Sequence, residues 1–270
     1  MARIALGSLR SSGVTTAALA LARTWPTERS VLLAEADPAG GTLAATLGRH
    51  TDPGLQSLAA DARRGLDPGA VALHTQPLSE NAALLLAPTA GERVRASLAM
   101  LGDLDQVLGA FAGDLLVDCG RLDVASPVLT SFGAAELSLL IVRPELADLQ
   151  ALSSMIESRG LSRIGERLGL VVTGSGPYPP DEIADALAIP VIGNLPTDAL
   201  GVRALVTDGA PRGLRARCPL LRSARSLADR LIGESSAAVE GSASTRIDPT
   251  SDDDAPAEAF DHARTREASR

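Results

Sequence analysis

The sequence contains no lysine. All 25 of its basic residues are arginine, so no lysine ammonium group is available to contact a phosphate or to form a Schiff base. Aromatic residues make up 2% of the chain and hydrophobic residues 45%, and therefore leucine, alanine and valine must fill the interior. So few aromatic side chains argue against a stacking platform for RNA or sugars.

Cysteine, histidine and long apolar runs are also scarce. Cys119 and Cys218 are too few for a disulfide framework, and their separation matches no zinc-binding spacing. His50, His74 and His262 are scattered and do not predict a metal site. No stretch approaches the ~18 continuous apolar residues of a membrane span, and the first residues lack the apolar run of a signal peptide. We therefore expect a soluble, cytoplasmic protein.

Short apolar runs alternate with longer helical stretches along most of the 270 residues. This pattern is typical of an α/β fold, in which helices flank both faces of a mostly parallel sheet. The runs are continuous, as expected for strands buried on both faces. The predicted strands are Arg3–Leu6, Val31–Ala36, Leu84–Ala87, Leu115–Asp118, Leu137–Val142, Leu168–Thr173 and Val191–Gly193. The predicted helices are Thr15–Arg23, Gly91–Leu108, Leu146–Ser158, Asp181–Leu187 and Pro219–Ile232, with one or two short helices in Thr51–Pro77.

The helix and strand pattern stops near Glu234. Residues 234–270 contain nine acidic residues and four arginines, with few large apolar side chains. Such a segment buries too little apolar surface to offset the entropy lost on ordering. We therefore predict one large domain over residues 1–233 and a disordered acidic tail over residues 234–270.

The first predicted strand leads into a loop of small residues that ends where a helix begins. This geometry points several N–H groups at one spot, at the positive end of the helix dipole. A P-loop adds a lysine for the phosphates and a hydroxyl for magnesium. Here Thr15 supplies the hydroxyl and Gly13 the tight turn, but Val14 stands where the lysine belongs. By itself the segment is equally compatible with an ordinary strand-to-helix turn. The predicted ligand-binding residues are Arg10, Ser11, Ser12, Gly13, Val14, Thr15 and Thr16.

Two further predicted strands end in carboxylates. One ends at Glu35 and Asp37, and another ends at Asp118. Because ligands bind at the carboxyl ends of parallel strands, the loop and these carboxylates occur in the order that a magnesium–nucleotide site needs. We predict Asp37 as the catalytic residue and Thr15 and Asp118 as metal ligands.

With these motifs, residues 2–232 resemble the MinD/ParA family of P-loop ATPases, whose phosphate loop carries two lysines. Gly13, Thr15 and Thr16 keep the family's loop, whereas Leu9 and Val14 replace the two lysines. Glu35–Pro38 matches the family's Asp-x-Asp-Pro segment, and Asp118 matches the Walker B aspartate. Leu139–Glu145 and Ile189–Pro196 match two later strand regions, and Thr173 stands where the family often has an asparagine near the adenine. Ser8, Ser11 and Ser12 occupy loop positions where glycine is usual.

The resemblance implies ATP and Mg²⁺ as ligands, a homodimer, and a protein partner from a partition, pilus or division system. The missing lysines change what is expected of the chemistry, because charge-assisted phosphate contacts contribute ~1.5–3 kcal/mol each. Losing two lowers affinity by roughly two orders of magnitude or more. Arg10, beside the first lysine position, is a candidate substitute. We expect ATP hydrolysis to be absent or very slow.

A basic cluster precedes the tail. Between residues 203 and 230 the chain has seven arginines and two aspartates, and a basic region in an acidic protein favours anionic partners. The resemblance implies nonspecific DNA binding here, although a solvated helix face gives the same pattern. The predicted patch comprises Arg203, Arg212, Arg215, Arg217, Arg222 and Arg225.

Two alternative functions stay open. The chain is compatible with a scaffold that binds no nucleotide and works through its surface alone. It is also compatible with a dinucleotide-binding oxidoreductase, since the small-residue loop and Glu35 at the end of the second strand mimic such a site. The oxidoreductase reading leaves Asp37 and Asp118 without a role.

Overall fold

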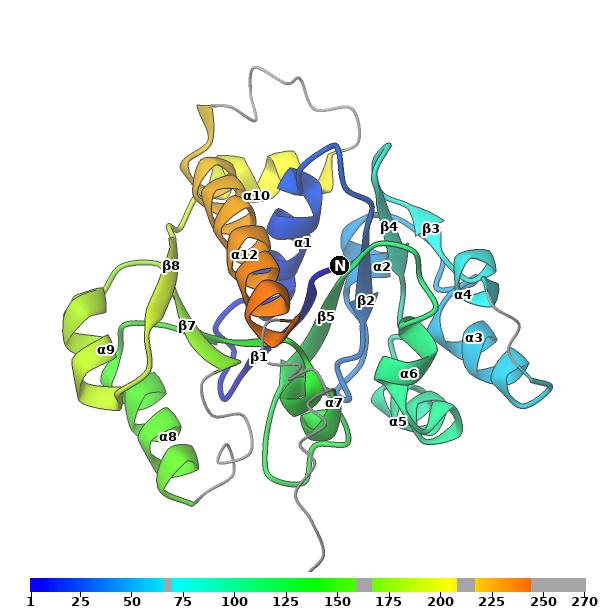
Figure 1. Cartoon of the computed structure of the whole chain (residues 1–270), viewed down its shortest axis with the longest axis horizontal. Helices are drawn as coiled ribbons and strands as arrows, with labels where there is room; N and C mark the ends of the chain where they lie inside the picture. Colours follow the sequence, from blue (N-terminus) through cyan, green and yellow to red (C-terminus); the bar gives the residue numbers. More distant parts are fainter. Residues whose placement is uncertain (66–68, 159–166, 208–216, 244–270) are drawn as a thin grey trace, which may run out of the picture.

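The computed structural model describes residues 1–65, 69–158, 167–207 and 217–243, with the backbone alone for residues 234–243. Within these residues the strands form one sheet in the order β3-β4-β2-β5-β1-β6-β7-β8 (Figure 1). Neighbouring strands are parallel except at the edge, where β3 runs antiparallel to β4. The strands are β1 (Arg3–Ser8), β2 (Val31–Glu35), β3 (Gln76–Pro77), β4 (Ala82–Leu85), β5 (Asp114–Arg121), β6 (Leu137–Val142), β7 (Leu168–Thr173) and β8 (Val191–Leu195).

Helices cover both faces of the sheet, which confirms the predicted α/β class. One face packs against α1, α2, α10 and α12, and the other against α3 and α5 to α9. The helices are α1 (Val14–Thr24), α2 (Leu43–Thr46), α3 (Leu55–Ala62), α4 (Ala70–Leu73), α5 (Gly91–Leu101), α6 (Leu104–Leu108), α7 (Leu129–Ala134), α8 (Leu146–Glu157), α9 (Pro180–Leu187), α10 (Ala199–Val206) and α12 (Pro219–Ala243).

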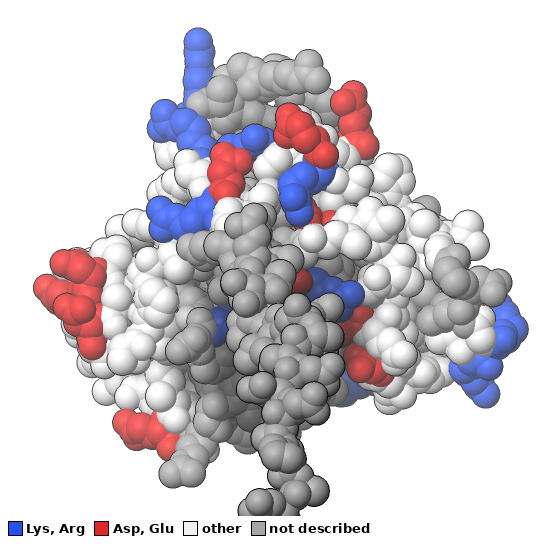
Figure 2. All heavy atoms as spheres, viewed as in Figure 1, with Lys and Arg blue, Asp and Glu red and all other residues white. Residues whose placement is uncertain are grey.

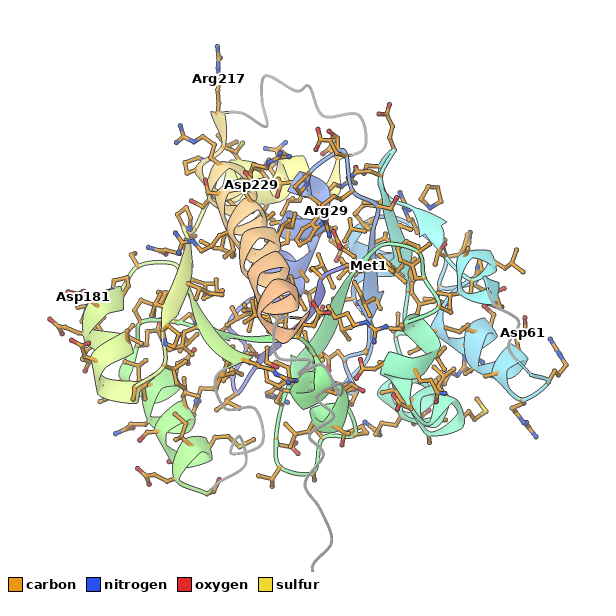
Figure 3. The ribbon with its side chains drawn as sticks, in the orientation of Figure 1. Met1, Arg29, Asp61, Asp181, Arg217 and Asp229 are labelled. Carbon is orange, nitrogen blue, oxygen red and sulfur yellow. The ribbon has the colours of Figure 1, made fainter. Side chains whose placement is uncertain are left out.

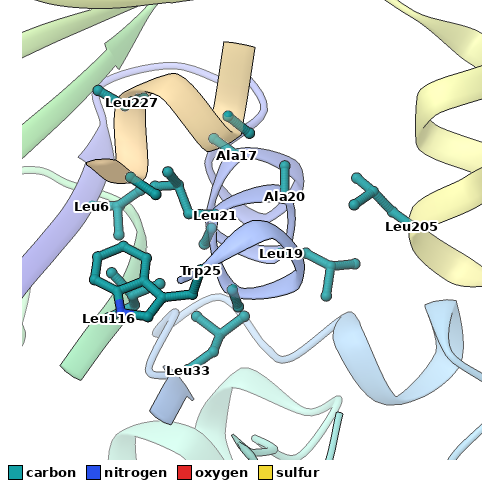
Figure 4. Close-up of a cluster of buried hydrophobic side chains, with 14 of the residues drawn as sticks. Leu6, Ala17, Leu19, Ala20, Leu21, Trp25, Leu33, Leu116, Leu205 and Leu227 are labelled. Carbon is teal, nitrogen blue, oxygen red and sulfur yellow. The ribbon is translucent and has the colours of Figure 1, made fainter. Parts of the chain in front are cut away.

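The central strands are buried almost throughout, as their continuous apolar sequences predict. Helix α1 lies against β1 and α12. Figure 4 shows Leu21 of α1 and Trp25, the C-cap of this helix, packed near Leu6 and Leu116 of the sheet. This packing holds α1 against β1 and β5.

Several predicted boundaries shift by one to three residues in the structure, and two helices differ further. The helix predicted over Gly91–Leu108 is two helices, because Gly102 has φ 69° and Asp103 caps a new helix by accepting a hydrogen bond from Gln106 N at 3.0 Å. The helix expected to end at Ile232 continues to Ala243. The backbone of residues 234–243 continues this helix, and this segment contains no proline and three alanines.

Residues 244–270 of the predicted tail lie outside the described residues. Helices α2, α7 and α10 and the edge strand β3 are not among the elements predicted from the sequence. Among the described residues, no helix combines the length and the apolar character needed to cross a membrane.

Candidate functional site

The loop between β1 and α1 has the shape of an anion-binding turn. Gly13 has φ 86°, in the left-handed region that favours glycine, and it is the N-cap of α1. The first helical bond runs from Ala17 N to Gly13 O at 2.9 Å. The N–H groups of Val14, Thr15 and Thr16 therefore belong to the first turn, where the helix itself offers no acceptor. These donors suit an anionic ligand.

Distant side chains hold this loop in place. The Ser12 hydroxyl donates to Asp148 Oδ2 at 2.6 Å, and the Thr173 hydroxyl donates to Ser12 O at 2.9 Å. Arg143 Nη2 donates to Ser11 O at 2.9 Å. No local sequence pattern indicates the contribution of Asp148, because this residue comes from α8, more than 130 residues further along the chain.

The carboxylate of Asp118 lies beside the loop at the end of a central strand. β5 pairs with both β1 and β2, which sets Asp118 opposite Leu6 and Glu35. Its Oδ1 accepts a hydrogen bond from Gly120 N at 2.9 Å, whereas its Oδ2 is buried without a hydrogen-bond partner. Burial raises the pKa of Asp118 to about 7, while the Thr15 hydroxyl beside it acts to lower that pKa.

This arrangement fits a divalent cation better than it fits an empty polar core. A buried carboxylate oxygen without a partner is costly, and a hydroxyl with a carboxylate is the donor set that a phosphate-bound Mg²⁺ takes from a protein. Thr15 and Asp118 are the residues that would hold the ion, and their role as metal ligands stays a prediction. Among the described residues, no group of three or more His, Cys, Asp or Glu side chains is placed to bind a metal by itself. The missing ligands would have to come from phosphate and water.

The two carboxylates after β2 differ in their surroundings. Glu35 is buried, and its oxygens accept hydrogen bonds from the N–H groups of Thr42, Leu43 and Ala87 at 2.6, 2.9 and 3.0 Å. Glu35 is therefore a structural anchor for the turn that follows β2.

Asp37 is only partly buried and lies against Gly120, so that a Cβ at position 120 would overlap its carboxylate. Its Oδ1 accepts a hydrogen bond from Ala39 N at 2.8 Å. Partial burial raises the pKa of Asp37, and Arg121 acts in the opposite direction. Asp37 therefore lies beside Gly120, two residues after Asp118, and its catalytic role stays a prediction.

A pocket of about 660 Å³ opens beside the loop. This volume falls in the range of small-molecule sites. Its walls come from the loop, from the ends of β6, β7 and β8, and from α10. The lining residues include Ser12, Gly13, Thr16, Arg143, Thr173, Pro196 and Arg203. Thr173, predicted near the base, is in this wall.

The residues at the two lysine positions are apolar and mostly enclosed. Val14 is 6% exposed and belongs to the core under α1. Leu9 is partly buried against the opposite core. Arg10, the predicted substitute, is exposed and does not line the large pocket.

The basic cluster is partly engaged within the protein. Arg225 pairs with Asp229 at 3.2 Å, and Arg230 donates to Ile192 O at 2.7 Å. Arg212 and Arg215 lie outside the described residues. The other members of the predicted patch, Arg203, Arg217 and Arg222, are exposed without an ion pair in the described part of the chain.

Figure 2 shows acidic side chains interspersed with basic ones over α10 and α12. In Figure 3 Arg217 points away from the body, and Asp229 lies on α12. This mixed surface gives less support to DNA binding than the sequence count does.

The strand order removes the basis of the oxidoreductase reading. In a dinucleotide-binding fold, the first two strands are neighbours, so that the acidic residue after the second reaches the ribose bound at the first. Here β5 lies between β1 and β2, and Glu35 is held by backbone N–H groups.

The sequence matches no protein-family model and none of the curated proteins. Its structure is similar to that of a ParA family ATPase from Chlorobium tepidum, with a TM-score of 0.70, 16% identity, and coverage of 84% of this chain and 99% of the other. It is also similar to the septum site-determining protein MinD in complex with Mg-ADP from Pyrococcus horikoshii, with a TM-score of 0.61, 20% identity, and coverage of 87% and 99%.

An ATP complex of a McdA variant from Cyanothece gives a TM-score of 0.63 and 19% identity, with coverage of 86% of this chain and 96% of that one. The chain thus has the MinD/ParA-like P-loop fold, which confirms the family resemblance at the level of the fold. At these identities the likeness does not transfer an activity.

Proposed function

We propose that this chain is a positioning protein of the ParA/MinD kind that binds an adenine nucleotide with Mg²⁺ weakly and hydrolyses it very slowly or not at all. We propose further that it works in the cytoplasm as a homodimer, with a protein partner from a partition, pilus or division system. The positioning role is supported by the likeness of the fold to ParA, MinD and McdA.

One observation carries the nucleotide part of the proposal. The buried, unpartnered Oδ2 of Asp118 lies beside the Thr15 hydroxyl, next to a loop of free N–H donors and a pocket of about 660 Å³. Mg²⁺ bound there would neutralise phosphate charge. The same loop lacks lysine, which removes charge stabilisation from phosphoryl transfer. Asp37 is the residue we assign to any residual hydrolysis.

Titration of the purified protein with a fluorescent ATP analogue and Mg²⁺ tests this part. We expect a dissociation constant in the micromolar range, lost in Thr15→Ala and kept in Thr27→Ala, a matched threonine exposed away from the site. Phosphate release should be at or barely above that of a protein-free blank. Release at an ordinary enzymatic rate, about 1 s⁻¹ or faster, that Asp37→Ala abolishes would contradict the proposed loss of hydrolysis.

Imaging of a fluorescent fusion in the native host tests the positioning role. We expect the wild type at discrete cellular sites and the Thr15→Ala/Asp118→Asn double variant spread evenly. An even distribution of the wild type would rule out positioning.

A scaffold that needs no nucleotide is the second candidate. It is favoured by the internal bonds from Asp148, Thr173 and Arg143, which hold the loop without any ligand. A scaffold gives no titration signal, and its double variant remains at the same cellular sites as the wild type.

A further inference from the structure

Arg143 is an arginine that the fold brings to the phosphate loop. It follows β6, which pairs with β1 in parallel, so the segment after β6 arrives beside the loop that leaves β1. Its Nη2 donates to Ser11 O at 2.9 Å. Together with Ser12 and Gly13 it lines the pocket of about 660 Å³. A positive charge therefore lies where the ligand's anionic end would meet the loop.

The guanidinium group of Arg143 is held in place but has unused donors. Arginine has five N–H donors in a planar fork. Besides the bond to Ser11 O, the nearest acidic atoms are Glu145 Oε1 at 3.9 Å from Nη1 and Asp148 Oδ2 at 3.7 Å from Nε. Both distances are too long for hydrogen bonds, and the side chain is 41% exposed. The group is therefore positioned without being saturated.

The negative charge of Asp148, next to the loop, also favours a cationic side chain at this position. Asp148 is 5% exposed and accepts hydrogen bonds from the Ser12 hydroxyl and from Arg143 N, at 2.6 and 3.1 Å. A buried carboxylate so close to the loop repels a phosphate. Arg143 offsets that charge. Arg10 lies outside the pocket and bonds to the loop only through its backbone carbonyl, which accepts from Ser12 N at 2.8 Å. Arg203 lines the pocket from α10, but its guanidinium group has no hydrogen bond to the loop among the described residues.

We propose that Arg143 contacts the phosphates of a nucleotide seated in this pocket and takes over part of the charge of the missing lysines. The proposal rests on the nucleotide binding proposed above and goes further, because it assigns a cationic residue and a ligand preference. Affinity should rise with the number of phosphates from adenosine to ATP, and Arg143 should be the source of that rise.

The test measures binding of adenosine, ADP and ATP with Mg²⁺ to the wild type, Arg143→Gln, Arg143→Lys and Arg63→Gln. Arg63 is an exposed matched control at the C-cap of α3. We expect Arg143→Gln to weaken ATP binding by about 10- to 100-fold and to leave adenosine binding unchanged. Arg143→Lys should keep part of the ATP preference, and Arg63→Gln should keep all of it.

Equal weakening of adenosine and ATP in Arg143→Gln would overturn the proposal, since a residue that only shapes the loop affects all ligands alike. Unchanged ATP affinity would overturn it too. If the glutamine variant does not fold, Arg143→Met, which keeps an apolar stem without charge, replaces it in the same comparison. If the wild type binds none of the three ligands, nucleotide binding itself fails. If it prefers ATP and the Arg143 variants keep that preference, only the assignment of Arg143 fails.

Discussion

Val14 stands at the position of a phosphate-binding lysine, and Val14→Lys is the sharpest perturbation of the site. In the free protein Val14 is 6% exposed and packs with Ala17 and Ala18 in the core under α1. Burial of a valine side chain contributes about 1.5–3 kcal/mol, and a lysine stem recovers part of it when the ammonium group reaches solvent. We expect the free energy of unfolding to fall by about 1–2 kcal/mol, which lowers Tm by roughly 2–8 °C.

The same substitution should strengthen nucleotide binding. One charge-assisted phosphate contact contributes ~1.5–3 kcal/mol, so the dissociation constant for ATP with Mg²⁺ should fall by about 10- to 100-fold. Val14→Met is the matched control, since it has a stem of similar length without the charge. It should leave the affinity for ATP unchanged.

Two assays on the three proteins check this reasoning. Titration with a fluorescent ATP analogue gives the affinity, and thermal unfolding with and without MgATP gives the stability. A saturating ligand at about 100 times its dissociation constant adds about 2.7 kcal/mol to stability, so MgATP should recover the loss in Val14→Lys. If the lysine variant binds no more tightly than the methionine variant, the loop is not a phosphate site. If it is more stable than the wild type without ligand, the valine does not contribute to the core as described.

Three further predictions concern carboxylates and a glycine. Asp118 has its pKa raised to about 7 by burial, so the folded state holds a proton that the unfolded state releases, and stability falls as pH rises towards 7. In EDTA, urea unfolding should show the wild type losing about 2 kcal/mol relative to Asp118→Asn between pH 5.5 and 8; parallel pH profiles would refute this. Asp114 accepts hydrogen bonds from Arg29 at 2.5 and 2.6 Å; burial by itself would raise the pKa of Asp114, but these bonds help to lower it. The stability contributed by the ionised Asp114 should therefore be present above its unfolded pKa and be lost as pH falls through its folded pKa. The acid-unfolding curve of Asp114→Asn should lack this loss of stability. Gly120 has φ 60° and no room for a Cβ beside Asp37. Gly120→Ala should therefore lower the free energy of unfolding by about 2 kcal/mol or more. In a double-mutant cycle, adding Asp37→Gly to the same chain should reduce this loss.

The fold class was predictable because the signal for it is local. Strands buried on both faces need continuous apolar runs, and those runs are visible without knowing which strands are neighbours. Boundaries set by one backbone angle were less predictable. The break between α5 and α6 depends on the positive φ of Gly102, and a glycine within a helical pattern does not by itself show that it will adopt that angle.

Part of the candidate site could be predicted from the sequence. Gly13, Thr15 and Asp118 follow from the rule that parallel strands place their ligands at their carboxyl ends. The hydrogen bonds of Glu35 and Asp118 were not visible in the sequence, because both residues end apolar strands. The structure separates them by their hydrogen bonds, since Glu35 accepts three from backbone N–H groups and Asp118 retains a free oxygen.

The sequence by itself determined that this protein has no lysine for a phosphate, since the identity of a side chain does not depend on the fold. It also determined the small-residue loop and the threonines that begin α1. Only the tertiary structure decided what surrounds that loop. Asp148, Arg143 and Thr173 reach it from 130 or more residues away, because β6 and β7 follow β1 in the sheet order. Strand order brings these segments together, and no local pattern encodes it.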